Sequence, residues 1–298
     1  MQKIRLGLEW FLNPDHVPFL VGLEQGWFED EGIDLALVEP EEHFDALDEI
    51  EAGKMDFAIT EPIHLVADRA QGQKVVGFAR FLHTNGGVMY LAGRGIERPR
   101  DLVGKRIQYP GAPGPGGPAI VRTMVEADGG SCRVDDFTPV NNGFFHTDAL
   151  AEDKADLATL IFYNFEILEA RGRGLPAEFF ALKDWGVPDF CQLILITTEK
   201  VLEAQRGTAE ALVRVLRRGI DFLHQHPEEA KAIYHRRTEA DPGDAMADAI
   251  FAATLPCFTY DLSMSADYYA HLETWMRQTG QTSTAIDPAA CWTNALAI

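Results

Sequence analysis

A histidine and a carboxylate lie three residues apart in the stretch DFAITEPIHLVADRAQG: Glu61 precedes a predicted helix, and His64 lies in its first turn. A neutral imidazole offers one hydrogen-bond donor and one acceptor. His64 can therefore contact a ligand, act as a general acid or base, or simply satisfy a local hydrogen bond. We expect it to line a ligand pocket, with catalysis as the alternative. For Glu61, a solvated surface position is an equally good interpretation.

Three further candidates follow the first predicted strand, KIRLGLEW. Trp10 ends this strand and presents a flat face that can stack on a planar ligand, a contact worth on the order of 1 kcal/mol beyond the area it buries. Asn13 and His16 lie in the next loop, NPDH, where Asn13 can equally make a turn hydrogen bond of its own. We expect all three at a ligand site, and core packing is the alternative for Trp10.

The segment FYNFE closes a later predicted strand with aromatic rings, an amide and a carboxylate. Tyr163, Asn164 and Glu166 are therefore our candidates in the second half of the chain. A carboxylate that leaves water needs hydrogen-bond donors to offset its desolvation, and a ligand amine can supply them. We expect Glu166 to receive such a donor.

Residues 110–120, PGAPGPGGPAI, form a glycine- and proline-rich loop before a predicted helix. Backbone N–H groups around Gly111 can face a phosphate or carboxylate at that helix N-terminus, and a plain connecting loop is the alternative. The prolines remove donors and the GK[ST] ending is missing, so we expect no nucleoside triphosphate site. Asp189, in DFCQL, is a further ligand-binding candidate. Cys191 would need a neighbouring base to act as a nucleophile, and the sequence names none.

The elements that must position these residues alternate between strand and helix signals. Along residues 1–93 this alternation predicts βαβ units and a parallel sheet covered on both faces. It restarts at KRIQY, and the apolar run VPDFCQLILIT predicts a return to the first sheet. We therefore expect an α/β fold of two lobes. Residues 1–93 and 194–298, with the C-terminal helices, form lobe 1, and residues 94–193 are inserted as lobe 2. Open α/β sheets bind ligands beyond the carboxyl ends of their strands, so we expect a ligand cleft between the lobes.

Composition narrows the class of protein. The 298 residues are 46% hydrophobic and 24% charged, which is typical of a globular protein, and the formal net charge of -20 argues against nucleic acid as a partner. The four cysteines form no C-x-x-C, so we expect free buried thiols and no metal site. No apolar run reaches the roughly 18 residues that span a bilayer, and no leader precedes the first strand. We expect a cytoplasmic protein from the sequence as it stands, and a periplasmic or extracytoplasmic one if a signal peptide has been removed.

Several ordered segments resemble one known family. The opening LEWFLNPDHVPFLVGLEQGWFEDEGIDLALVEP, followed by GKMDFAITEPIHLVADRAQG, ADLATLIFYNFE and WGVPDFCQLILIT, is similar to the thiamin-precursor (formylaminopyrimidine) binding proteins of ABC transporters and to the fungal-type pyrimidine synthase of thiamin biosynthesis. The resemblance covers roughly residues 4–225. It implies the type II periplasmic-binding-protein fold, a small heteroaromatic ligand such as an aminopyrimidine, and an ABC permease as partner.

The family divides into receptors and an enzyme. In the synthase pattern a lysine precedes the histidine by four residues and forms a Schiff base with pyridoxal phosphate, but here Thr60 occupies that place. Of the synthase's cysteine-rich run only Cys191 remains. We therefore expect a substrate-binding protein without pyridoxal phosphate. The alternative is a cytoplasmic enzyme of pyrimidine or other heteroaromatic metabolism that uses His64, and a soluble ligand sensor is the third. The exact ligand, pyrimidine or flavin-like, and the oligomeric state stay open.

Overall fold

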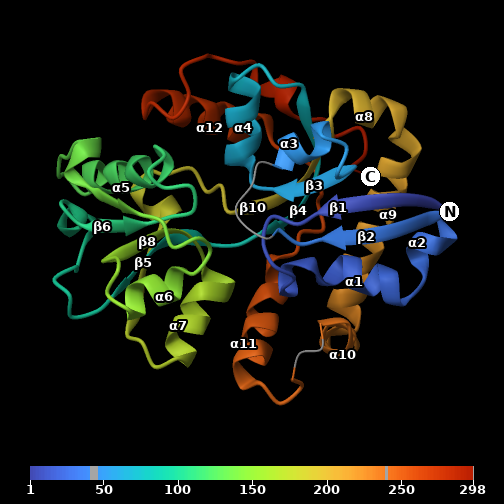
Figure 1. The fold of residues 1–298 in the computed structure, drawn as a ribbon, viewed down its shortest axis with the longest axis horizontal. Coiled ribbons are helices and arrows are strands. Elements are labelled where there is room, and N and C mark those ends of the chain that lie inside the picture. Colours follow the sequence, from blue (N-terminus) through green and yellow to red (C-terminus); the bar gives the residue numbers. More distant parts are fainter. Residues whose placement is uncertain (41–45, 239–240, 298) are drawn as a thin grey trace. The chain divides into compact units, whose positions relative to one another are not determined.

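The chain folds into two compact units in the computed structural model, which describes residues 1–40, 46–238 and 241–297 (Figure 1). The first unit comprises Met1–His83, Gln192–Ala270 and Ile286–Ile298, and the second comprises Thr84–Cys191 and His271–Ala285. Within the described residues, no helix combines the length and the apolar character that a bilayer span requires.

A five-stranded sheet forms the centre of the first unit, in the order β2-β1-β3-β10-β4. Its strands are β1 (Gln2–Gly7), β2 (Ile33–Val38), β3 (Phe57–Thr60), β4 (Val75–His83) and β10 (Gln192–Thr198). β1 pairs in parallel with β2 and β3, whereas β10 runs antiparallel to β3 and β4. β3 and β10 are buried along their whole length, because helices cover both faces of the sheet and leave apolar runs without polar alternation.

Helices surround this sheet. They are α1 (Val17–Glu24), α2 (Trp27–Asp30), α3 (Ala46–Glu51), α4 (Pro62–Ala70), α8 (Glu199–Ala204), α9 (Arg206–Gln225), α10 (Pro227–Thr238) and α11 (Ala245–Thr254), with short 3-10 turns at Pro14–His16, Leu255–Cys257 and Pro288–Cys291. α9 packs closely on α1 at Gly219, where an added Cβ would lie 2.4 Å from the Pro18 carbonyl oxygen. The absence of a side chain at Gly219 therefore sets the approach of the two helices.

The second unit has its own five-stranded sheet, in the order β7-β6-β8-β5-β9. The strands are β5 (Gly86–Leu91), β6 (Arg106–Gln108), β7 (Thr138–Val140), β8 (Leu157–Phe162) and β9 (Ala177–Ala181). The helices are α5 (Gly116–Ala127), α6 (His146–Ala151) and α7 (Leu168–Gly172), with 3-10 turns at Pro99–Leu102, Val134–Asp136 and Leu182–Trp185 and a π-helical turn at Tyr163–Ile167. β6 is parallel to β7 and β8, and β5 is antiparallel to β8 and β9.

The units differ from the expected lobes at three places. The first unit resumes at Gln192, two residues earlier than expected. β5, expected in lobe 1, pairs with β8 and β9, so the chain enters the second sheet after His83. α12 (Ala266–Gln278) was expected wholly in lobe 1, but its part from His271 onward belongs to the second unit. Trp275 anchors it there, because its indole N–H donates to the Thr123 hydroxyl at 3.0 Å. Apolar periodicity identifies a buried strand or helix but does not specify which sheet it joins.

The four cysteines differ in their burial. Cys191 and Cys291 are buried, whereas Cys132 and Cys257 are only partly buried. Burial raises the pKa of the Cys132 thiol to about 11. The Cys132 thiol is therefore protonated and weakly nucleophilic near neutral pH.

Candidate functional site

Two parallel strands of the first unit, β1 and β3, end at the same edge of their sheet, since Leu6 pairs with Phe57 and Gly7 with Ala58. Each is followed by residues that the sequence marks as candidates. Trp10, Asn13 and His16 follow β1, and Glu61 and His64 follow β3. The topology thus collects all five first-unit candidates at one sheet edge.

The loop after β1 is held by hydrogen bonds among its own side chains. The Asn13 side-chain oxygen accepts the Asp15 N–H at 2.8 Å, and the Asn13 N–H donates to His16 Nδ1 at 3.2 Å. His16 is fully buried, and its Nε2 lies 3.1 Å from both carboxylate oxygens of Glu9. Because Nδ1 accepts, the neutral ring carries its proton on Nε2 and donates it to Glu9. Asn13 and His16 therefore fix the loop that bears Trp10.

The charge of this His16–Glu9 pair follows from two opposing effects. Burial of the imidazole disfavours its charged form, but the Glu9 carboxylate, together with Asp15 and a backbone hydrogen bond to Asn13, outweighs burial and raises the pKa of His16 above its ordinary value. Next to the pair, the half-buried Trp10 ring packs at 4.2 Å, centroid to centroid, on Phe11, which is 39% exposed. The loop thus presents aromatic surface beside a buried hydrogen-bonded pair.

Glu61 and His64 form a second pair after β3. Glu61 is the extended residue before α4, and His64 Nε2 lies 3.1 Å from Glu61 Oε2. The His64 side chain is 42% exposed, whereas that of Glu61 is 17% exposed. Thr60, the last residue of β3, is buried. A carboxylate beside a solvent-accessible imidazole can share hydrogen bonds with a ligand or exchange a proton with it.

The end of β8 in the second unit is shaped by a bulge. Gly87 pairs with Ile161 but Met89 pairs with Ala158, so two residues, Thr159 and Leu160, oppose one on β5. Leu160 has φ 64°, a left-handed conformation that few non-glycine residues adopt. A bulge of this kind bends a strand and redirects the side chains that follow it, and π-helical turns recur at functional sites.

The π-helical turn after β8 orients its three candidates differently. Glu166 is buried, and its Oε2 accepts the Phe162 N–H at 2.9 Å. Asn164 is also buried, and its side-chain oxygen accepts the Thr84 hydroxyl at 2.7 Å. Tyr163 is 37% exposed and meets the Phe179 ring edge-on at 5.3 Å. The turn therefore presents an aromatic ring outward and holds a carboxylate inside the unit.

The loop between β6 and α5 is compact. Gly111 has φ 74°, and its carbonyl oxygen accepts the Gly114 N–H at 3.0 Å. The Tyr109 hydroxyl donates to the Gly114 carbonyl oxygen at 2.6 Å, and its ring lies against Gly117, where a Cβ would come within 2.4 Å. These contacts close the loop on itself at the N-terminus of α5.

Asp189 lies apart from the π-helical turn in the sequence, in the segment that leads out of the second unit. It is half-buried and directly precedes Phe190, which stacks on Trp275 with ring centroids 6.1 Å apart.

Two polar residues that directly precede β5, Thr84 and Asn85, were not predicted as site residues, although both form hydrogen bonds with the π-helical turn. The only sequence signal for them is a Thr-Asn pair between two strand patterns.

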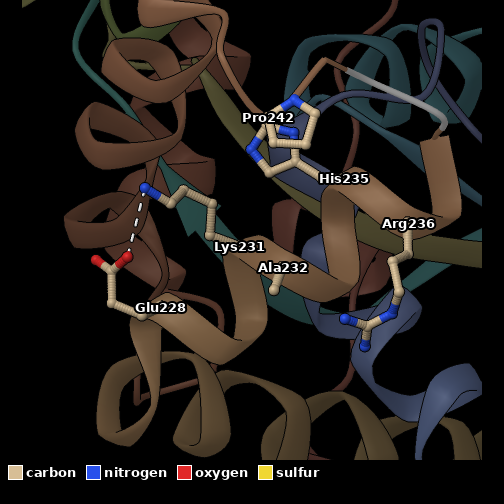
Figure 2. A pocket seen from close by; sticks show the side chains of 6 residues that line it. All are labelled: Glu228, Lys231, Ala232, His235, Arg236 and Pro242. Atoms are coloured by element: carbon tan, nitrogen blue, oxygen red, sulfur yellow. Dashed lines mark ion pairs between the residues drawn. The ribbon is translucent and has the colours of Figure 1, made fainter.

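A separate pocket of about 430 Å³ lies on α10, and none of the predicted candidates lines it (Figure 2). Its lining residues are Glu228, Lys231, Ala232, His235, Arg236 and Pro242. Lys231 Nζ lies 3.4 Å from Glu228 and 3.5 Å from Asp248, and Arg236 pairs with Glu24 at 3.1 Å. Lys231 and Arg236 extend in different directions (Figure 2), so the charged groups of this pocket do not converge on one point. Within residues 1–40, 46–238 and 241–297, no three metal-ligating side chains cluster.

Both the architecture and the sequence of this chain match known proteins. Its fold is that of the periplasmic binding proteins: the alkanesulfonate-binding protein SsuA from Xanthomonas axonopodis pv. citri superposes with a TM-score of 0.74 at 14% identity, covering 98% of each chain. The chain belongs to the NMT1/THI5-like family, whose model matches residues 13–230. The expected fold class and the family resemblance are thereby confirmed.

Two relatives represent the two arms of this family. A formylaminopyrimidine-binding protein from Halalkalibacterium halodurans is 28% identical over 231 residues, which are 77% of this chain and 69% of that protein. A 4-amino-5-hydroxymethyl-2-methylpyrimidine phosphate synthase from Legionella pneumophila is 30% identical over 266 residues, which are 87% of this chain and 81% of that protein. The choice between receptor and synthase therefore depends on individual residues.

Proposed function

We propose that this protein is a substrate-binding component of an ABC-type transporter that takes an aminopyrimidine-like thiamin precursor and leaves it chemically unchanged. The observation that carries the proposal is the end of β8, where the π-helical turn presents the exposed Tyr163 ring and the buried Glu166 carboxylate. A flat pyrimidine can pack on an aromatic ring, while a carboxylate accepts hydrogen bonds from its amino group. The relationship to a formylaminopyrimidine-binding protein supports this ligand class.

The other candidate residues have two proposed roles: some contact the ligand, and others hold the loop that bears Trp10. In this proposal Trp10 and the Glu61–His64 pair contact the ligand, because the His64 side chain is accessible and the Trp10 loop presents aromatic surface. Asn13 and His16 hold the Trp10 loop in place through their mutual hydrogen bond. Three more residues stay in the proposed ligand environment: Gly111 in the loop before α5, Asn164 in the π-helical turn, and Asp189 at the exit of the second unit.

The second candidate function is a pyrimidine-metabolising enzyme on the same fold. The Glu61–His64 pair favours it, since an accessible imidazole 3.1 Å from a carboxylate is suited to proton transfer. Thr60 weighs against the synthase reaction, because it occupies the place of the lysine in the synthase pattern and a hydroxyl cannot form a Schiff base with pyridoxal phosphate. We therefore rank the enzyme second.

The test combines calorimetric titration with intact mass spectrometry. Purified protein is titrated with formylaminopyrimidine, 4-amino-5-hydroxymethyl-2-methylpyrimidine, riboflavin and pyridoxal phosphate. We expect one of the two pyrimidines to bind without a change in its mass or that of the protein. A hydrogen bond to a charged group is worth ~1.5–3 kcal/mol, so Glu166→Gln should weaken binding about 10- to 150-fold.

Glu178→Gln is the matched control, because it removes the same charge from an exposed position on β9 of the same unit. This variant should bind like the wild type. Turnover of a pyrimidine, or a covalent mass change on the protein, that is abolished by His64→Ala while binding persists would refute the receptor and establish the enzyme.

The transporter role is a separate part of the proposal. Binding proteins of this fold include a periplasmic sulphonate-binding protein and a ligand-binding component of an ABC-type import system, which supports an extracytoplasmic receptor with a permease partner. Stimulation of a reconstituted ABC permease ATPase by the ligand-loaded protein, and not by the ligand alone, is the expected result. A protein that binds a pyrimidine but stimulates no permease encoded beside its gene would instead fit the ligand sensor.

A further inference from the structure

Asn85 directly precedes β5 and lies beside the end of the neighbouring strand β8. Its carbonyl oxygen accepts the Tyr163 N–H at 3.0 Å. Because Gly86 pairs with Phe162 in the antiparallel ladder, Asn85 is opposite Tyr163, the first residue of the π-helical turn. The backbone thus fixes Asn85 beside the turn that bears Glu166.

The side chain of Asn85 contains an acceptor that folding leaves unused. Its Oδ1 is buried, and no donor in the described part of the chain reaches it. Neighbouring polar groups have partners, since the Thr84 hydroxyl donates to Asn164 and Glu166 accepts the Phe162 N–H. A buried acceptor without a donor destabilises a protein, and a ligand that donates a hydrogen bond to Asn85 Oδ1 would recover that cost.

We propose that Asn85 contacts the bound ligand and accepts a hydrogen bond from its exocyclic amino group. This inference rests on the proposed function, in which the ligand is an aminopyrimidine. An aromatic amine has two N–H donors, and both need acceptors when the group leaves water. Glu166 supplies one acceptor and Asn85 supplies the second. Together they select a ring that bears an amine over the same ring without one, because the latter donates to neither acceptor.

The test compares two ligands on three proteins. Wild type, Asn85→Leu and the smaller Asn85→Ala are titrated by calorimetry with 4-amino-5-hydroxymethyl-2-methylpyrimidine and with its analogue that has hydrogen in place of the amine, using competition where binding is weak. Both variants should bind the amino ligand about tenfold more weakly than the wild type. Their affinity for the analogue should stay within about twofold of the wild-type value.

Thermal unfolding of the free proteins separates ligand recognition from folding. The melting temperature of Asn85→Leu should equal or exceed that of the wild type, because the variant removes an unpaired buried acceptor. An unchanged affinity for the amino ligand, or an equal loss for both ligands, would overturn the assignment of Asn85 while leaving the receptor intact. A wild type that binds neither formylaminopyrimidine nor 4-amino-5-hydroxymethyl-2-methylpyrimidine would overturn the proposed function and this inference together.

Discussion

His146 should make the stability of this protein unusually sensitive to mild acid. It is the first residue of α6, only 4% exposed, and its Nδ1 has no hydrogen-bond partner among the described residues. Burial disfavours the charged imidazole and lowers the pKa of His146 to about 4, from 6.5 in an unfolded chain. Between these two values the unfolded chain binds a proton that the folded protein cannot accept, so stability falls as the pH falls.

The size of the effect follows from the two pKa values. One pKa unit corresponds to ~1.4 kcal/mol, so at pH 5 this one imidazole should cost about 2 kcal/mol of folding free energy relative to pH 7.5. The cost is about 3 kcal/mol at pH 4 and reaches its full value only below that pH. Well above pH 6.5 the ring is neutral in both states and the cost vanishes. His146→Leu replaces the ring with an apolar side chain of similar size that cannot bind a proton.

Urea unfolding at pH 7.5 and pH 5 measures this difference. We expect His146→Leu to equal or exceed wild-type stability at pH 7.5, and to gain a further ~2 kcal/mol over the wild type at pH 5. His271→Leu, at an exposed position of the same unit, controls for the loss of a histidine as such. A stability difference between His146→Leu and wild type that is the same at both pH values would refute the reasoning.

Two further predictions concern backbone positions. Gly219→Ala should destabilise the protein by ~1–3 kcal/mol in urea unfolding, because the new methyl group would collide with the Pro18 carbonyl oxygen. Gly207→Ala on the same helix meets nothing within 4 Å and should stabilise by up to about 1 kcal/mol, so equal effects of the two changes would contradict the close packing of α9 on α1. At Leu160, whose φ is 64°, Asn should be tolerated better than Val by ~1 kcal/mol in the same assay, since β-branched residues avoid the left-handed region. A more stable Val variant would argue against the bulge in β8.

Much of the fold is local in origin and therefore predictable from the sequence. The alternating strand and helix patterns predicted two lobes, each built of strands and helices. The run VPDFCQLILIT was expected to return to the first lobe, and its QLILIT part lies in β10 of the first sheet. The ends of β1, β3 and β8 could be located because polar and aromatic residues follow each apolar run. Side chains at the carboxyl ends of parallel strands collect at one edge, so the order of elements places the candidates there.

The partners of each side chain depend on the tertiary structure. The apolar sequence of β5 is compatible with either sheet, and only its pairing with β8 and β9 assigns it to the second. The sequence FYNFE likewise does not determine which of its side chains are buried. In the folded chain, with the bulge at Leu160 and the π-helical turn, Glu166 is buried and Tyr163 is exposed. The sequence does not mark Asn85, because its unused acceptor exists only once the chain has folded around it. Local periodicity determines which face of an element is apolar, whereas long-range packing decides which polar atoms lose water and which acceptors are left for a ligand.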